Sequence, residues 1–180
     1  QTMLNLHQKN SDKVIGGNAI AAVSAAVLKA GSLASGIPLY RHIGGSSAVV
    51  LPAAAYGIAG GSNRYEYAHE AGAKPTYAFI AHDYKSFSEA SYALWEVVAD
   101  WQNLMQKKYG LLPLRSTGGS TSTGFVYVPP GIVESEKQLW QMMCECIARS
   151  GQEGKIGIQV DLAADCFYNK ETRTYDNLFG

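Results

Sequence analysis

The chain has 180 residues, of which 47% are hydrophobic, so it can bury a sizeable core in one domain or a little more. Fifteen basic and fifteen acidic residues give a formal net charge of zero, with no dense basic run, which argues against a nucleic-acid partner and against electrostatic binding to a membrane. No segment reaches the roughly 18 uninterrupted apolar residues of a membrane span, and the amino terminus lacks the layout of a signal peptide. We therefore expect a soluble, cytoplasmic, globular protein.

The three cysteines are Cys144, Cys146 and Cys166. They match neither a disulfide framework nor a zinc site, because a Cys-x-Cys pair within a helix points its thiols to different faces. We interpret them as reduced packing residues. The chain begins with Gln and stops at Leu-Phe-Gly without an evident element to close the fold, so we expect it to be a piece of a longer polypeptide.

Small residues dominate the first predicted element, a helix over residues 18–35 that ends at Gly36. Its apolar stripe comprises Ile20, Val23, Val27 and Leu28. Pro38 separates it from a short second helix near residues 39–42. The sequence Gly44-Gly45-Ser46-Ser47 then predicts a joint between two units.

Two strands are predicted next, over residues 49–58 and 77–81, with a polar loop between them. Pro52 places the first strand near a sheet edge or a bend. Neighbouring strands of this kind could pair antiparallel before the helices start.

Each of the two predicted core helices opens with a capping box, Ser86 to Glu89 and Ser135 to Gln138. The apolar stripe of the first comprises Ala90, Leu94, Val97, Val98, Trp101, Leu104 and Met105, and that of the second comprises Leu139, Met142, Met143, Cys146 and Ile147. Residues 114–132 between them are rich in Ser, Thr and Gly, and such loops often lie over sites.

Residues 155–164 form the strand around which the chain is organised. Branched side chains alternate with small or polar ones, which predicts a strand whose branched face packs against helices. In a barrel of parallel strands the other face looks inward, and a carboxylate at the carboxyl end of the strand lies where such barrels place their chemistry. Asp161 is that carboxylate. The alternative is that it only caps the turn at the strand end.

Residues 15–20 read Ile-Gly-Gly-Asn-Ala-Ile, residues 37–43 read Ile-Pro-Leu-Tyr-Arg-His-Ile, and residues 160–164 read Val-Asp-Leu-Ala-Ala. Together these motifs resemble the enolase family. Residues 15–20 are similar to the family's Leu-Gly-Ala-Asn-Ala-Ile, and residues 37–43 to its Val-Pro-Leu-Tyr-Arg-His-Ile. Residues 60–62 are similar to part of its Asn-Gly-Gly-Ser-His, residues 86–90 to its Thr-Phe-Ala-Glu-Ala, and residues 160–164 to its Met-Asp-Val-Ala-Ala. The resemblance covers nearly the whole chain.

The resemblance implies an α/β fold, namely the opening strand-strand-helix-helix-strand portion of an enolase-type TIM-like barrel. We expect residues 1–47 to be the helical end of the family's amino-terminal α+β domain with its linker. Residues 48–180 would be the first part of the barrel domain, which would continue beyond this chain.

The activity that the resemblance implies is dehydration of 2-phosphoglycerate to phosphoenolpyruvate in glycolysis, with Mg²⁺ as cofactor and a homodimer or larger assembly as the quaternary state. In that reaction a lysine removes the α-proton, magnesium stabilises the enediolate, and a protonated Glu donates to the departing hydroxide. Asp161 matches a magnesium ligand of the family. The other metal carboxylates and the catalytic lysine would lie beyond Gly180, and the mobile serine loop before Gln1.

Three positions depart from the family pattern. Asn63 stands where the family has a His that contacts substrate, and Thr76 where it has an acidic residue that helps to bind substrate. Ser122 lies in a segment, residues 120–125, that has no acid where the family carries the carboxylate assigned to protonating the leaving hydroxyl. A hydroxyl has too high a pKa to replace it, and losing such an acid costs on the order of 10² to 10⁴ in rate.

Other ionisable residues offer weaker candidates. Three in the loop before Thr76 could replace the missing acid, although a solvated charged loop is the more ordinary interpretation: Glu66, His69 and Glu70. Three histidines are interpreted as having no catalytic role. His82 is interpreted as a hydrogen-bonding residue at a helix entry. His7 and His42 lie in the part that resembles the family's amino-terminal domain.

Three functional hypotheses remain open. The first is a divergent enolase-like protein whose chemistry is weakened or lost and whose role is structural, in the cytoplasm or in a cilium or flagellum, as for the enolase-like forms of sperm flagella. The second is a working magnesium-dependent enolase with a rearranged site. The third is a protein of the same fold that acts on another acid through Asp161 and residues outside this chain.

Overall fold

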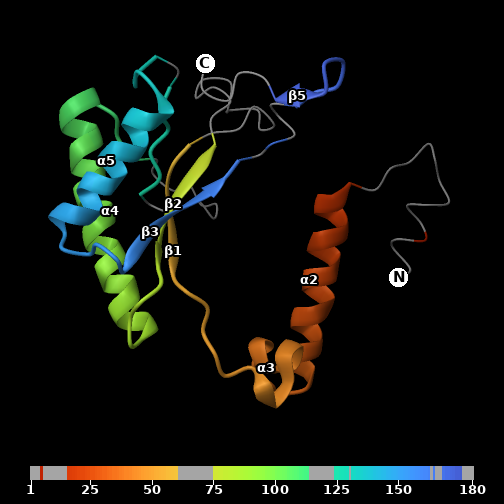
Figure 1. Ribbon diagram of the computed structural model, residues 1–180. Coiled ribbons are helices and arrows are strands. Elements are labelled where there is room, and N and C mark those ends of the chain that lie inside the picture. The colour runs from red at the N-terminus through yellow and green to blue at the C-terminus, as the bar shows by residue number, and fades with distance from the viewer. Residues whose placement is uncertain are drawn as a thin grey trace. The chain divides into compact units, whose positions relative to one another are not determined.

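The computed structural model describes Asn5 and residues 16–60, 75–113, 124–129, 131–162, 164 and 168–175. The chain divides into two compact units between Leu51 and Pro52, called here unit 1 and unit 2, and Figure 1 shows the elements of each. Each unit is described by itself.

Unit 1 contains the helices α2 (Gly17–Ala34) and α3 (Leu39–Gly44) and the 3-10 turn η1 (Gly45–Ser47). The predicted end of the first helix is confirmed, since Gly36 has φ 64°, a left-handed conformation that favours glycine. The buried Ser32 hydroxyl donates to Ile37 O at 2.6 Å and ties the turn to the helix. The unit extends past the predicted joint at residues 44–47, through η1, to Leu51.

The apolar stripe of α2 is largely exposed, as Val23, Val27 and Leu28 show. The helix has 18 residues and a mean hydropathy of 1.3, which is long and apolar enough to cross a membrane by length and composition alone. The expectation of no uninterrupted apolar run of this length is not contradicted, because Asn18, Ser24 and Lys29 interrupt the apolar residues of α2. The core helix of a soluble protein passes the same test, so the finding does not place α2 in a membrane.

Unit 2 is built on a three-stranded sheet of β1 (Ala55–Ala59), β2 (Thr76–Ala81) and β3 (Ile156–Asp161), in the order β1-β2-β3. Both neighbouring pairs are antiparallel, so the predicted antiparallel pairing of the first two strands is confirmed. β1 and β3 consequently run in the same direction on either side of β2.

The predicted start of β1 is wrong. Residues 49–54 have no strand structure, and Val49, Val50 and Leu51 are exposed. Pro52 cannot donate to a ladder, and the sheet hydrogen bonds begin only near Ala54, whose carbonyl accepts from Ala81 N at 2.9 Å. An apolar run without a pairing strand therefore stays extended and outside the sheet.

Two helices, α4 (Phe87–Tyr109) and α5 (Glu136–Arg149), contact the sheet and each other, as Figure 1 shows. Both predicted amino-terminal caps are confirmed, because Ser86 Oγ accepts from Glu89 N and Ser135 Oγ accepts from Gln138 N. Both predicted stripes lie in the core, with Leu104 partly buried and the other members fully buried. Ala93 also belongs to the buried face of α4.

The core of unit 2 lies between the sheet and these helices. Trp101 of α4 meets Phe79 of β2 edge to face, with ring centroids 6.5 Å apart, and donates from Nε1 to Ile58 O at 3.2 Å. Ile58 lies where the β1–β2 register shifts, and its carbonyl also accepts from Val126 N at 2.8 Å, so this carbonyl has two donors outside the β1–β2 ladder. Val126, from the long segment before α5, is fully buried and bridges Ala59 in parallel.

A short hairpin of β4 (Tyr168–Asn169) and β5 (Thr174–Tyr175) follows β3. The sequence analysis expected no element here. Asn169 Oδ1 accepts from the amides of Glu171 and Thr172, and Arg173 has φ 58°. The turn therefore specifies this hairpin. Its two-residue strands are too short to show an alternating pattern in the sequence.

Candidate functional site

The candidate site lies at one end of the three-stranded sheet, where β1 and β3 end and β2 begins. Thr76 and Asp161 are direct register partners there. Opposite residues of an antiparallel pair project from the same face, with Cβ atoms about 4.5 to 5.5 Å apart. The two side chains are therefore neighbours, one half-buried and one exposed.

Asp161 lies on the face of β3 away from the helices, as predicted, while the prediction that this face looks into a barrel stays a prediction. Ile156 is buried, and Ile158 and Val160 pack against the same core, so the branched face of β3 meets the helices. Alternation then places Asp161 on the opposite face together with Gly157 and Gln159. Its role as a metal ligand stays a prediction.

The backbones of β1 and β2 approach closely at this end. Gly60 has φ 132°, and a Cβ on it would lie 2.3 Å from Pro75 O and 2.6 Å from Thr76 Cα. Only glycine fits this contact without displacing backbone. The start of β2, and Thr76 with it, is thereby held against the end of β1.

Most of the other candidates fall outside the residues that the structure describes: Asn63, Ser122, Glu66, His69, Glu70 and His7. His82 follows β2 at the end of the sheet opposite Asp161, and its amide donates to Lys155 O at 3.0 Å. His42 is exposed on α3 in unit 1. Among the candidates that the structure describes, only Thr76 and Asp161 are brought together.

Among the described residues, one carboxylate at this end of the sheet fits the ligand chemistry of Mg²⁺. Mg²⁺ takes oxygen ligands and is commonly held by one or two carboxylates, with water and phosphate oxygens completing the octahedron. The exposed Asp161 carboxylate fits one such ligand. Across the described ranges no group of three His, Cys, Asp or Glu side chains could hold a metal ion, so further ligands would have to come from elsewhere.

A buried polar contact beneath this end of the sheet was missed by the sequence analysis. The Tyr77 hydroxyl donates to Glu136 Oε2, and both residues are almost fully buried. Burial, together with the hydrogen bond to Glu136, raises the pKa of Tyr77 above its ordinary value. The available signal was an inward-facing Tyr in β2, since a buried phenol needs a hydrogen-bond partner.

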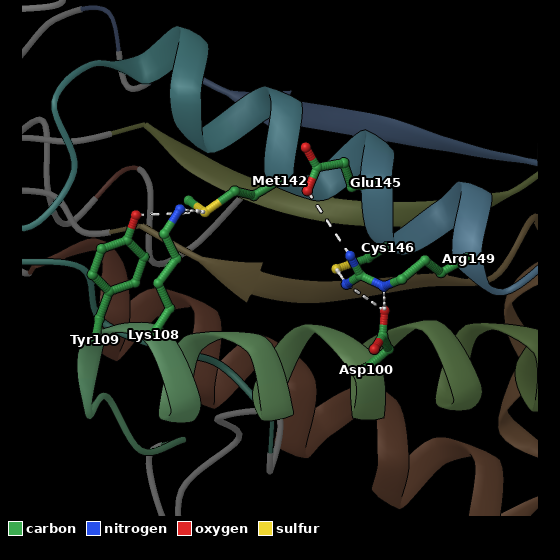
Figure 2. A network of polar contacts seen from close by, with 7 residues as sticks. All are labelled: Asp100, Lys108, Tyr109, Met142, Glu145, Cys146 and Arg149. Carbon is green, nitrogen blue, oxygen red and sulfur yellow. Dashed lines mark hydrogen bonds and ion pairs between the residues drawn. The ribbon is translucent and has the colours of Figure 1, made fainter.

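A second polar network joins α4 to α5 (Figure 2). Arg149 donates from Nε and Nη2 to Asp100 Oδ2 at 3.0 and 2.7 Å, and from Nη2 to Cys146 Sγ at 3.3 Å. The hydroxyl of Tyr109 and the ammonium of Lys108 reach Met142 Sδ at 3.6 and 3.8 Å. These contacts hold the two helices together.

The cysteines of α5 lie on different faces, as predicted. Cys146 is fully buried, and its burial, with the nearby Asp100 carboxylate as the next cause, raises the pKa of the thiol to about 12. The packing role is wrong for Cys144, which is exposed. Cys166 lies outside the described residues.

Residues 48–179 match the family model of the enolase C-terminal TIM barrel domain. The chain belongs to the enolase family. It is 34% identical to the enolase of Eimeria tenella over 171 residues (92% of this chain and 36% of that protein) and to enolase 2 of Hevea brasiliensis over 165 residues (90% and 35%). It is also 34% identical to the enolase of Bifidobacterium longum over 174 residues (96% and 38%).

Membership of the enolase family confirms the predicted fold class, an α/β fragment of the enolase barrel. The strand-strand-helix-helix-strand order of β1, β2, α4, α5 and β3 is the order on which that prediction rested. The chain spans about a third of the length of the relatives it matches.

Proposed function

We propose that this enolase-family chain forms part of a divergent enolase-like protein that keeps a Mg²⁺ ligand but converts 2-phosphoglycerate to phosphoenolpyruvate poorly or not at all. One observation carries the proposal: Thr76 is the register partner of Asp161. The family resemblance assigns an acidic residue to the position of Thr76 and a magnesium ligand to that of Asp161. The site thus keeps one carboxylate and replaces its direct neighbour by a neutral hydroxyl.

The replacement affects binding and chemistry differently. Asp161 would hold a magnesium ion, which when bound supplies positive charge to stabilise an anionic enediolate. Thr76 offers a hydroxyl that donates or accepts hydrogen bonds but does not ionise near neutral pH. By the family resemblance, the sequence also has Asn63 in place of a His that contacts substrate and an acid-free segment at residues 120–125, so the protein would lack the family's group for protonating the departing hydroxide. Product formation should suffer more than metal binding.

A protein with weakened chemistry would act through its surface. We propose a structural or interaction role for it, as a homodimer or within a larger assembly, in the cytoplasm or in a cilium or flagellum. Residues 1–47 would be the end of an enolase amino-terminal domain and residues 48–180 the opening of the barrel. The contiguous match of residues 48–179 to the barrel model supports that division.

The alternative function is an active magnesium-dependent enolase with a rearranged site. The retained carboxylate of Asp161 at the sheet end favours it. A replacement acid would then have to come from Glu66, His69 or Glu70. In an active protein, each of these three residues would be changed to alanine in turn. Turnover would be abolished in the variant that lacks the residue serving as the acid.

The deciding experiment follows phosphoenolpyruvate formation from 2-phosphoglycerate by the full-length protein at saturating Mg²⁺. An ordinary enolase at equal concentration is the control. We expect a rate at least about 10² lower than the control, the cost of losing a general acid. A rate within about tenfold of the control, a barrier difference of about 1.4 kcal/mol, would defeat the proposal in favour of the active enzyme.

A further inference from the structure

The hydrogen bond between Tyr77 and Glu136 connects the sheet to the first residue of α5. Tyr77 is 1% exposed and Glu136 is 5% exposed, so the contact is shielded from water. Trp140, one turn further along α5, meets the Tyr77 ring edge to face, with centroids 6.1 Å apart and planes at 84°. The phenol is therefore held at its hydroxyl and at its ring by the same helix.

This contact lies directly beneath the candidate site. Tyr77 follows Thr76 in β2 and pairs with Val160, which precedes Asp161 in β3. Fixing the Tyr77 side chain on the core face therefore fixes the backbone that carries Thr76 and the backbone opposite Asp161.

Stability alone is a poor reason for this arrangement. Burying a carboxylate is costly unless it is hydrogen-bonded, and an apolar pair of the same volume is often as stable or more so. Glu136 also lies in the first turn of α5, where the helix dipole favours a negative charge. The directional hydrogen bond specifies where the first turn of α5 meets β2. An apolar contact would leave this position less defined.

We propose that Tyr77 and Glu136 are positioning residues that hold the start of β2 so that Thr76 stays in register with Asp161. They touch neither metal nor substrate and act through the β2–β3 pair. The inference rests on the proposed function where it concerns magnesium. Its structural part does not depend on activity.

The test uses Tyr77→Phe, which removes only the hydroxyl, and Glu136→Gln, whose amide oxygen can still accept the bond. Tyr84→Phe is the matched control, because Tyr84 donates to Gln152 Oε1 at 2.7 Å near the other end of the β2–β3 pair. Amide hydrogen exchange and Mg²⁺ affinity by calorimetry are measured for the full-length protein and each variant. Both readouts are independent of turnover.

In Tyr77→Phe we expect exchange at residues 76–78 and 160–162 to be about tenfold faster, while residues 80–82 and 156–158 are unchanged. Mg²⁺ affinity should fall about tenfold, the lower end of the loss seen when groups supporting a metal ligand are removed. Glu136→Gln should stay within about threefold of the wild type in both measurements. Tyr84→Phe should leave Mg²⁺ affinity unchanged.

The inference is overturned if exchange in Tyr77→Phe rises uniformly along β2 and β3, which is the mark of general destabilisation, or does not rise at the site end. It is also overturned if Tyr84→Phe lowers Mg²⁺ affinity as much as Tyr77→Phe. If the wild type binds no Mg²⁺, the proposed function fails in its metal part, and the exchange pattern alone decides the positioning role.

Discussion

The buried thiol of Cys146 makes the stability of unit 2 depend on pH. In the folded chain the pKa of this thiol is raised from 9.0 to about 12, mainly by burial. The unfolded chain therefore binds fewer protons than the folded chain above about pH 9, and the stability present below that pH is lost as the pH rises toward 12. The slope for one group is at most about 1.4 kcal/mol per pH unit.

We expect Cys146→Ala to remove this loss of folding stability between about pH 9 and pH 10. At higher pH, Tyr77 would add a loss of stability of its own. Urea unfolding across that interval measures it. Cys144→Ala, on the exposed face of the same helix, should keep the pH dependence of the wild type. Parallel pH curves for the wild type and Cys146→Ala would contradict the assignment.

The exposed carboxylate of Asp161 should matter for metal binding and little for folding. We expect Asp161→Ala to lower Mg²⁺ affinity at least about tenfold, because losing a ligand costs no less than losing a group that supports one. The free energy of unfolding should change by less than about 0.5 kcal/mol, as for surface substitutions. Calorimetric Mg²⁺ titration and urea unfolding of the full-length protein give the two quantities.

Asp83 provides the control for this measurement. It is also exposed and lies just after β2, at the opposite end of the sheet. Asp83→Ala should leave Mg²⁺ affinity unchanged. Equal losses in both variants would show that Asp161 acts only through net charge.

At the scale of elements, the contact between the end of β1 and the start of β2 depends on Gly60. A Cβ there would lie 2.3 Å from a backbone oxygen, at a φ of 132°. We expect Gly60→Ala to cost more than about 3 kcal/mol, since backbone strain and overpacking add. Gly110 has φ 69° and no atom within 4 Å of an added Cβ.

Gly110→Ala is therefore the matched control, and its expected cost is about 1 kcal/mol from backbone strain alone. Both costs are measured by urea unfolding. Similar costs at the two positions would mean that β1 and β2 can separate at Gly60 without penalty. The inference that the start of β2, with Thr76, is held tightly against the end of β1 would then be wrong.

The α4–α5 interface in Figure 2 combines contacts of unequal value. The Asp100–Arg149 ion pair has side chains 35% and 47% exposed, so Asp100→Asn should cost less than about 1 kcal/mol. Met142 is 3% exposed, and Met142→Ala should cost about 2 to 5 kcal/mol because it leaves a cavity. Unfolding curves of both variants check the order, and a larger cost for Asp100→Asn would contradict it.

The same elements show how far the sequence predicts the fold. The positions of α4 and α5 follow from local patterns, namely Ser86 and Ser135 as caps and the apolar stripes behind them. The start of β1 was mispredicted because strand formation depends on a pairing partner as well as on apolar character. The burial of Glu136 could not be predicted, because its partner Tyr77 lies 59 residues away in the sequence.

At the scale of the whole molecule, the candidate site is shared between distant parts of the sequence. Thr76 and Asp161 come from β2 and β3, with α4 and α5 between them in the chain. The strand pattern singled out Asp161 and the family resemblance named Thr76, and only the register of the sheet places them side by side. The chain spans about a third of the length of its enolase relatives, so activity has to be tested on the full-length protein.

The departures from the family pattern predict which step of the enolase reaction is slowed. Removal of the α-proton needs a base and a stabilised enediolate, whereas loss of hydroxide also needs an acid. Residues 120–125 offer no such acid. We therefore expect the full-length protein to exchange the α-proton of 2-phosphoglycerate with solvent at least about tenfold faster than it forms phosphoenolpyruvate.

Proton NMR in deuterated buffer measures both rates in one sample, with an ordinary enolase run alongside. Loss of the α-proton signal without matching product would identify departure of hydroxide as the impaired step. Equal rates of exchange and product formation would contradict the prediction, because they require that an acid is still supplied. Absence of both reactions would place the defect earlier, in substrate binding or proton removal, where Asn63 and Thr76 replace the family's side chains.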